Sequence, residues 1–196
     1  MGTVAKRTLT VTADNKTITY GSGVALGSIT YSNFAAGEDA NALTTGATVT
    51  SLRTGLVGAG TYVGNYVAGG AASDNYDFSY VAGNLTVDRK VLTVTAGNYS
   101  ITYGDSITAG TLSYNGFIAG ESASNLLTAP TVSSTQSGLV NAGNYAGNYV
   151  AGGGASNNYS FNYVAGNLTV NKKALNVVAA NQAITYGATT PGSTLV

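Results

Sequence analysis

The sequence predicts a mostly β fold with a minor helical part, built as tandem domains. Three features support this prediction. Segments of the sequence recur at a fixed spacing, apolar and polar residues alternate in short runs, and 27 glycines interrupt those runs. Alternation with a period of two is typical of strands that bury one face, and glycine marks the turns between such strands.

The repeats are long and close in sequence. When residues 6–88 (repeat 1) are aligned with residues 89–171 (repeat 2), no gap is needed and 48 of the 83 positions are identical. The tetrapeptide Ile-Thr-Tyr-Gly occurs at residues 18–21, 101–104 and 184–187. Segments this similar must share one fold. We therefore expect two domains, 6–88 and 89–171, and a partial third copy over 172–196. The stretch Ala180–Val196 is expected either to fray or to pack on repeat 2.

The elements of repeat 1 follow from its patterning. Thr8–Ala13 alternates and predicts a strand, Asp14-Asn15 offers turn chemistry, and Lys16–Tyr20 predicts a second strand that forms a hairpin with the first. The alternation is lost over Ala36–Leu43, where early acidic residues favour a short helix. The remaining strands are predicted at Leu26–Tyr31, Thr48–Leu52, Thr61–Ala68, Tyr76–Val81 and Asn84–Val87.

This order of elements is that of a β-grasp-like domain: a β-sheet with a hairpin start, one short helix and further strands. In that arrangement, the first and last strands lie side by side and parallel, and the helix covers one face of the sheet.

The composition excludes several functional classes. Only 8% of residues are charged and the net charge is zero, which leaves no basic surface for nucleic acid. Cys and His are absent, so a catalytic triad, a cysteine nucleophile and the usual zinc ligands are excluded. No run of residues is apolar enough to span a membrane. We predict no enzyme activity, no cofactor and no catalytic or metal-binding residue.

Carboxylates are the remaining side chains that could support catalysis or bind a metal ion. Among the acidic residues, only Glu38 has an acidic counterpart in the other repeat, Glu121, and both are expected to stand at the start of the short helix. Asp74 and Asp77 are the nearest candidates for calcium ligands, but both are lost in repeat 2 and calcium takes six to eight oxygens.

Six tyrosines of repeat 1 recur in repeat 2, and two interpretations of them stay open. Their flat rings could form a carbohydrate- or protein-binding surface. Alternatively, they are half-buried strand residues that supply core volume while the hydroxyl reaches a polar partner. The residues chosen as the possible ligand surface are Tyr62, Tyr66, Tyr145 and Tyr149.

The motifs Leu-Thr-Val-Thr-Ala, Ile-Thr-Tyr-Gly, Gly-Asn-Tyr and Gly-Asn-Leu-Thr-Val together resemble the MBG ("mostly β-grasp") repeats of large bacterial surface adhesins, and the related YDG repeats. The resemblance covers essentially the whole chain. It implies stalk modules of filamentous-haemagglutinin-like adhesins, which act in cell adhesion and biofilm formation and are often exported by two-partner secretion. It also implies an extracellular or cell-surface location. The partners implied are neighbouring repeats, an outer-membrane secretion pore and extracellular polysaccharide.

The functional prediction is based on the short connection between the repeats. Only Asp88-Arg89-Lys90 separates the last strand of one repeat from the first strand of the next, and no flexible Gly/Ser linker is present. We expect a monomer in which successive domains form a stiff, elongated rod, with the repeats acting as a structural stalk that projects another region from the cell.

Overall fold

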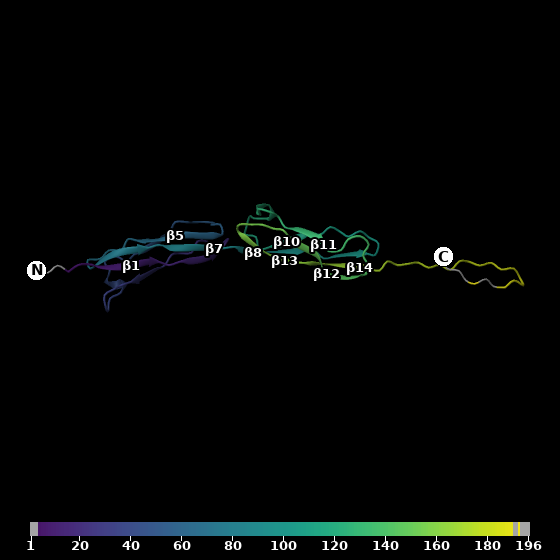
Figure 1. Cartoon of the computed structure of the whole chain (residues 1–196), viewed down its shortest axis with the longest axis horizontal. Coiled ribbons are helices and arrows are strands. Elements are labelled where there is room, and N and C mark those ends of the chain that lie inside the picture. The colour runs from purple at the N-terminus through teal and green to yellow at the C-terminus, as the bar shows by residue number, and fades with distance from the viewer. Residues whose placement is uncertain (1–3, 190–191, 193–196) are drawn as a thin grey trace.

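The computed structural model describes residues 4–189 and 192. Each repeat contains seven strands and one turn of 3-10 helix. Repeat 1 comprises β1 (Arg7–Ala13), β2 (Lys16–Thr19), β3 (Ile29–Ser32), η1 (Ala40–Ala42), β4 (Thr48–Ser51), β5 (Gly60–Gly69), β6 (Tyr76–Val81) and β7 (Gly83–Asp88). Repeat 2 comprises β8 (Lys90–Ala96), β9 (Tyr99–Thr102), β10 (Leu112–Asn115), η2 (Ala123–Asn125), β11 (Thr131–Ser134), β12 (Gly143–Gly152), β13 (Tyr159–Val164) and β14 (Gly166–Asn171). The two sets of strands follow one another along the long axis of the view (Figure 1).

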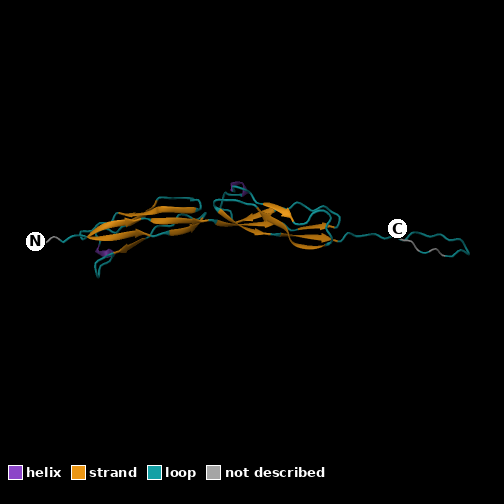
Figure 2. Cartoon of the chain, in the orientation of Figure 1, coloured by secondary structure: helices purple, strands orange, loops and turns teal. Residues whose placement is uncertain are grey.

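Each repeat is built from two sheets. In repeat 1, a three-stranded sheet has the order β3-β1-β6 and a four-stranded sheet has the order β2-β7-β5-β4. Repeat 2 reproduces both orders with β10-β8-β13 and β11-β12-β14-β9. Figure 2 shows that strands make up almost all the regular structure of the chain. The predicted mostly β class is therefore confirmed.

The predicted hairpin of Thr8–Ala13 with Lys16–Tyr20 is wrong. β1 pairs with β3 and β6, whereas β2 pairs with β7 in the other sheet. Asp14 and Asn15 do not reverse the chain because their side chains bind neighbouring strands instead. The Asp14 carboxylate accepts hydrogen bonds from Ser28 and Thr30, which lower its pKa, and Asn15 Oδ1 accepts from the backbone N–H of Asn84 at 2.7 Å.

A glycine allows the chain to cross from one sheet to the other at two adjacent points, between β1 and β2 and between β6 and β7. β6 passes into β7 beside the point where β1 passes into β2, and Gly83 stands at that crossing. A Cβ atom at Gly83 would lie 2.4 Å from the carbonyl oxygen of Ala13 and 2.5 Å from that of Asp14. Any side chain there would collide with backbone, so the close approach of the strands requires glycine. Gly166 holds the same place in repeat 2.

The predicted single sheet with the first and last strands side by side is wrong, because β1 and β7 lie in different sheets; instead, the two-strand unit β1–β2 pairs in parallel with the unit β6–β7. β1 and β2 run parallel to β6 and β7, with Arg7 opposite Tyr76 and Thr19 opposite Asp88. Because the pair is parallel, the chain enters a repeat at one end of these strands and leaves it at the other end. The other predicted strands are found close to their expected positions, with β6 over Tyr76–Val81 as predicted.

The helix predicted over Ala36–Leu43 is reduced to one 3-10 turn, Ala40–Ala42, which buries none of its residues. The Asp39 side chain caps the backbone N–H of Asn41, and Leu43 already has extended backbone angles. So short a segment cannot offset the cost of helix nucleation without an apolar face to pack. Glu38 consequently precedes a turn rather than a helix, and no helix covers the sheet of repeat 1.

The core lies between the two sheets of each repeat. Alternate residues of β1 (Leu9, Val11 and Ala13) are buried, as are Leu85 and Val87 of β7. Across both repeats, most of the buried apolar residues form one connected cluster, which includes Tyr20 and Tyr159. The core therefore continues through the junction between the repeats.

Residues 172–189 follow β14, and of these only Ala180 is even partly buried. They extend away from repeat 2 in Figure 1. The prediction for Ala180–Val196 falls partly outside the described residues, at 190, 191 and 193–196. Among the described residues, no helix is long and apolar enough to cross a membrane.

Candidate functional site: the junction between the repeats

One tyrosine of repeat 1 reaches into repeat 2. Tyr20 follows β2, where its backbone N–H donates to the carbonyl oxygen of Asp88 at 2.8 Å. Its side chain is 3% exposed, and its ring meets that of Tyr159 edge-on with 5.4 Å between the ring centroids. Edge-to-face rings of this kind stabilise contacts beyond the area they bury. Tyr20 is thus a core residue of the junction.

The polar end of that contact is a carboxylate that binds two phenols. The Tyr20 hydroxyl donates to Glu121 Oε1 at 2.5 Å, and the Tyr159 hydroxyl donates to Glu121 Oε2 at 2.5 Å. Hydrogen bonds to an ionised acceptor are shorter and stronger than neutral ones. Glu121 therefore joins the two repeats through Oε1, while Oε2 holds Tyr159 of its own repeat, and the Glu121 side chain is half-buried.

Two further contacts determine how repeat 1 packs against repeat 2. The backbone N–H of Ala59 in repeat 1 donates to Asn158 Oδ1 in repeat 2 at 3.0 Å. Gly21 has a φ of +90°, and a Cβ atom there would lie 2.3 Å from Cγ2 of Ile118. The turn after Tyr20 can approach repeat 2 this closely only because glycine has no side chain and tolerates a positive φ.

Burial at the junction changes the acidity of the phenols. Burial, and then the hydrogen bond to Glu121, raise the pKa of Tyr20 to about 12. The same two causes, in the same order, raise the pKa of Tyr159. Both effects favour the neutral phenol, because the ionised form would lose solvation and would repel the carboxylate.

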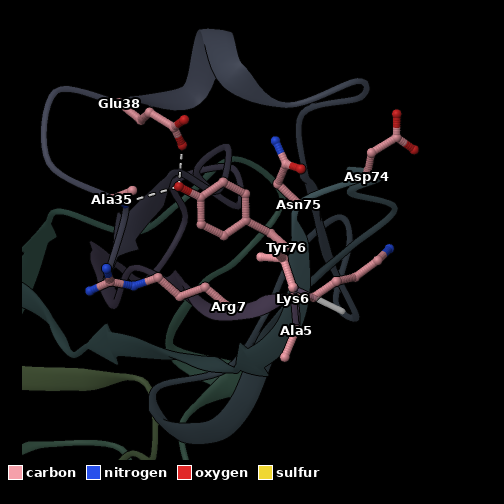
Figure 3. Close-up of a pocket in the computed structure, with 9 residues that line it drawn as sticks. Ala5, Lys6, Arg7, Ala35, Glu38, Asp74, Asn75 and Tyr76 are labelled. Atoms are coloured by element: carbon pink, nitrogen blue, oxygen red, sulfur yellow. Dashed lines mark hydrogen bonds between the residues drawn. The ribbon is translucent and has the colours of Figure 1, made fainter. Parts of the chain in front are cut away.

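The equivalent face of repeat 1 has the same groups and forms a hollow of about 270 Å³. Tyr76 donates to the Glu38 carboxylate and accepts from the backbone N–H of Ala35 at 2.9 Å, as Figure 3 shows. The bond to Glu38 raises the pKa of Tyr76. Lys6, Arg7 and Asn75 also line this hollow.

Two of the four predicted ligand-surface tyrosines are in the core. Tyr66 and Tyr149 are 0% exposed, and their hydroxyls donate to the backbone oxygens of Ala25 and Thr108. Neither ring has a face free for a sugar. Burial raises the pKa of both phenols. For these two residues the structural interpretation of the tyrosines holds, and the binding interpretation is wrong.

The other two predicted residues, Tyr62 and Tyr145, are half-buried. The Tyr62 hydroxyl donates to the backbone oxygen of Gly58, and the guanidinium of Arg53 lies 3.9 Å from the centre of its ring. The Tyr145 hydroxyl donates to the backbone oxygen of Asn141 in the same way. The four tyrosines therefore do not form one shared aromatic platform.

The acidic residues do not gather into a metal site in the part of the chain that the structure describes: no group of three or more potential ligands is found there. Glu38 and Glu121, expected at a helix start, bind tyrosine hydroxyls instead. Sequence reasoning missed the junction site, although the signal was present. Glu38 was recognised as the recurrent acid and Tyr20 and Tyr76 as recurrent tyrosines, but nothing in the spacing showed that they meet.

The comparison with protein families decides which repeat this is. A family model described as MBG domain (YGX type) matches residues 9–86 and again residues 92–169. The chain belongs to the MBG domain family. The type agrees with the Tyr-Gly pair that follows β2 and β9, and the family is one of non-enzymatic repeats found in large surface proteins.

The resemblance to MBG repeats is thus confirmed over both copies. No curated protein matches the chain significantly. No solved structure matches it significantly either.

Proposed function

We propose that these MBG repeats are structural spacers: stalk modules of a large bacterial surface adhesin that hold a distal adhesive region away from the cell, without catalytic activity. The repeats in this proposal are 6–88 and 89–171, with 172–196 as part of a third. The proposal also includes secretion to the cell surface and a monomeric, rod-like chain. An outer-membrane secretion pore and extracellular polysaccharide are its partners outside the chain.

The proposal rests mainly on the parallel pairing of β1 with β6 and of β2 with β7. Entry at Arg7 and exit at Asp88 lie at opposite ends of a two-strand unit of about 13 residues. At about 3.3 Å per residue, that unit advances the chain by roughly 40 Å. A tandem array of such units lengthens with every copy, whereas antiparallel pairing of β1–β2 with β6–β7 would return the chain to its starting end.

The contacts at the junction support stiffness. Arg89 alone separates β7 from β8, so the connection has almost no freedom of its own. Tyr20, Gly21 and Ala59 then dock on repeat 2 by ring packing, close approach and hydrogen bonds. A spacer needs both properties: length from the strands and resistance to bending from the docked turn.

Small-angle scattering on the chain and on arrays with added repeats tests the proposal. The maximum dimension should grow linearly, by roughly 40 Å for each added repeat. Growth with the square root of the repeat number, as for a flexible chain, would contradict the spacer function. The variant Tyr20→Ala should bend the array at one junction only.

A binding module is the second candidate, favoured by a different set of rings from the predicted one. Phe78 stacks on Tyr80 with centroids 6.2 Å apart, and Phe161 stacks on Tyr163 at 5.8 Å. Tyr80 and Tyr163 are 41% and 37% exposed. A glycan array separates the candidates: binding that is lost in the double variant Tyr80→Ala, Tyr163→Ala supports a lectin-like module, and the absence of any signal rejects it.

A further inference from the structure

The hollow at the entry end of repeat 1 has its polar groups already in place. Tyr76 is buried and is held between Glu38 and the backbone N–H of Ala35. Glu38 itself is exposed, and only one of its two oxygens takes part in a hydrogen bond with the described residues. Figure 3 shows the carboxylate directly above the Tyr76 hydroxyl, with Asn75 on the same side.

Repeat 2 shows what such a face binds. Glu121, Tyr159 and Asn158 are the counterparts of Glu38, Tyr76 and Asn75. The backbone bond under the phenol is also the same, since the Tyr159 hydroxyl accepts from the N–H of Ile118 at 3.1 Å. In repeat 2 this face holds the Tyr20 ring, the Tyr20 hydroxyl and the N–H of Ala59.

We propose that the hollow of repeat 1, formed by Ala35, Glu38, Asn75 and Tyr76, is a docking socket for the Tyr-Gly turn of another MBG repeat placed in tandem ahead of it. The incoming ring packs edge-on against Tyr76 and its hydroxyl donates to the free oxygen of Glu38. A backbone N–H of the same repeat donates to Asn75. The inference deepens the spacer function and rests on it.

The size and local chemistry of the hollow fit one side chain. Its volume of about 270 Å³ is below that of most pockets for drug-sized ligands, which begin at about 300 Å³. Ala35 stands where repeat 2 has Ile118, so the socket leaves more room for the glycine turn than the occupied one does. A tyrosine fits the hollow better than phenylalanine, because its hydroxyl can donate to the free carboxylate oxygen while its ring packs on Tyr76.

A repeat in the same chain fits this socket better than a second molecule does. In the occupied junction, Asp88 leads directly through Arg89 into β8. If repeat 2 of a second molecule docked in the same way, its Lys172 and Lys173 would fall where Lys6 and Arg7 of the first molecule already lie. A covalent junction removes that clash and also supplies a high effective concentration of the turn.

The experiment adds one repeat to the chain. A further copy of residues 89–171 is placed directly before Lys6, which reproduces the spacing of the existing junction. Because the chain has no Cys, pairs of spin labels can be introduced on either side of the new junction or of the old one. The distance distribution across each junction then reports how firmly it is docked.

The expected result is a narrow distribution at both junctions. Glu38→Gln should lower the ratio of docked to undocked states at the new junction by about tenfold, because a charge-assisted hydrogen bond is lost. Only the distance distribution across the new junction should broaden. Glu121→Gln is the matched control and should broaden only the old junction. Replacing the Tyr-Gly tyrosine of the added copy by phenylalanine tests the same bond from the other side and leaves the socket unchanged.

Three outcomes would overturn the proposal. The distance distribution across the new junction could be broad before any substitution, or it could stay unchanged in both Glu38→Gln and the phenylalanine variant. Alternatively, the unextended chain could form head-to-tail assemblies in sedimentation that Glu38→Gln abolishes, which would assign the socket to a second copy. Scattering from the unextended chain depends on the old junction alone, so failure of the spacer function is measured separately.

Discussion

Tyr20 and Tyr103 occupy the same position in two closely similar repeats, yet their surroundings differ. Both follow Ile-Thr, both precede a glycine with positive φ, and both donate a backbone hydrogen bond of 2.8 Å to the last residue of the repeat. Tyr20 is 3% exposed against repeat 2, whereas Tyr103 is 37% exposed. The local sequence builds the turn, and the neighbouring repeat decides whether its ring is buried.

This comparison also separates two roles for one motif. Within its own repeat, the Tyr-Gly turn only ends a strand. At a junction, the same turn supplies the ring, the hydroxyl and the close glycine contact that hold two domains together. Stability in such an array is expected to divide into a term for each repeat and a term for each interface.

The largest expected effect is the loss of the docked ring. Tyr20→Ala removes a buried aromatic side chain and should destabilise the junction by about 3 kcal/mol, as other truncations of buried aromatic residues do. Tyr103→Ala, at an exposed site, should cost no more than about 0.5 kcal/mol. Urea unfolding of both variants measures the difference. Equal losses would show that the junction contributes nothing.

The glycines give a second matched pair. Gly21 and Gly104 have φ values of +90° and +95°, so an alanine at either should cost about 1–2 kcal/mol in backbone strain. Only Gly21→Ala also collides with Ile118, whereas the nearest atom to a Cβ at Gly104 is the Lys173 Nζ at 3.9 Å. Gly21→Ala should therefore be the more destabilising by about 1–2 kcal/mol.

The added variant Ile118→Ala removes the colliding atom and should recover that excess. A double-mutant cycle on thermal unfolding measures the coupling between Gly21 and Ile118. Independent effects of the two substitutions would disprove the steric explanation.

Alkaline pH should weaken the junction at Tyr20. Burial, and then the hydrogen bond to Glu121, raise the pKa of this phenol from its usual 10.0 to about 12, so the docked side chain holds its proton more tightly than a solvent-exposed phenol does. Its contribution is complete below pH 10 and is lost as the pH rises to about 12. Tyrosinate absorbance against pH, compared between the parent chain and Tyr20→Phe, should show one late-titrating phenol that the variant lacks. If the two curves differ only by a phenol that titrates near pH 10, docking does not protect this group.

The smallest expected effect is at Asn158. Asn158→Ala removes the acceptor for the N–H of Ala59 and should cost about 1 kcal/mol, the usual contribution of one hydrogen bond. Asn75→Ala changes the same position in the unoccupied hollow of repeat 1 and should be nearly neutral. Hydrogen exchange at the Ala59 amide gives the direct measurement, and unchanged protection in Asn158→Ala would exclude the bond.

Much of the fold could be predicted from patterning. The strand at Tyr76–Val81 was placed correctly, but the first and last strands, expected side by side, lie in different sheets. The hairpin was wrong because Asp14-Asn15 is a turn signal only when its side chains serve the turn. Here they bind Ser28, Thr30 and Asn84, which are distant in sequence, and the chain crosses to the other sheet instead.

The candidate site shows the same limit. Glu38 and Glu121 stood out as the recurrent acids, but a helix start was the nearest local explanation for them. Their phenol partners lie 38 residues further along the chain, at Tyr76 and Tyr159, and for Glu121 also 101 residues back, at Tyr20. Contacts at such separations leave no periodic signal in the sequence.

By itself the sequence determined the repeat, the mostly β class, the family resemblance and the exclusion of chemistry that needs Cys or His. Those properties depend on composition and on local alternation, which are visible along the chain. Only the tertiary structure decided that β1 and β2 belong to different sheets, that Tyr66 and Tyr149 are core residues, and that Tyr20 joins two domains. The physical reason is that burial and hydrogen bonding are shared between segments, so a residue's role depends on what packs against it.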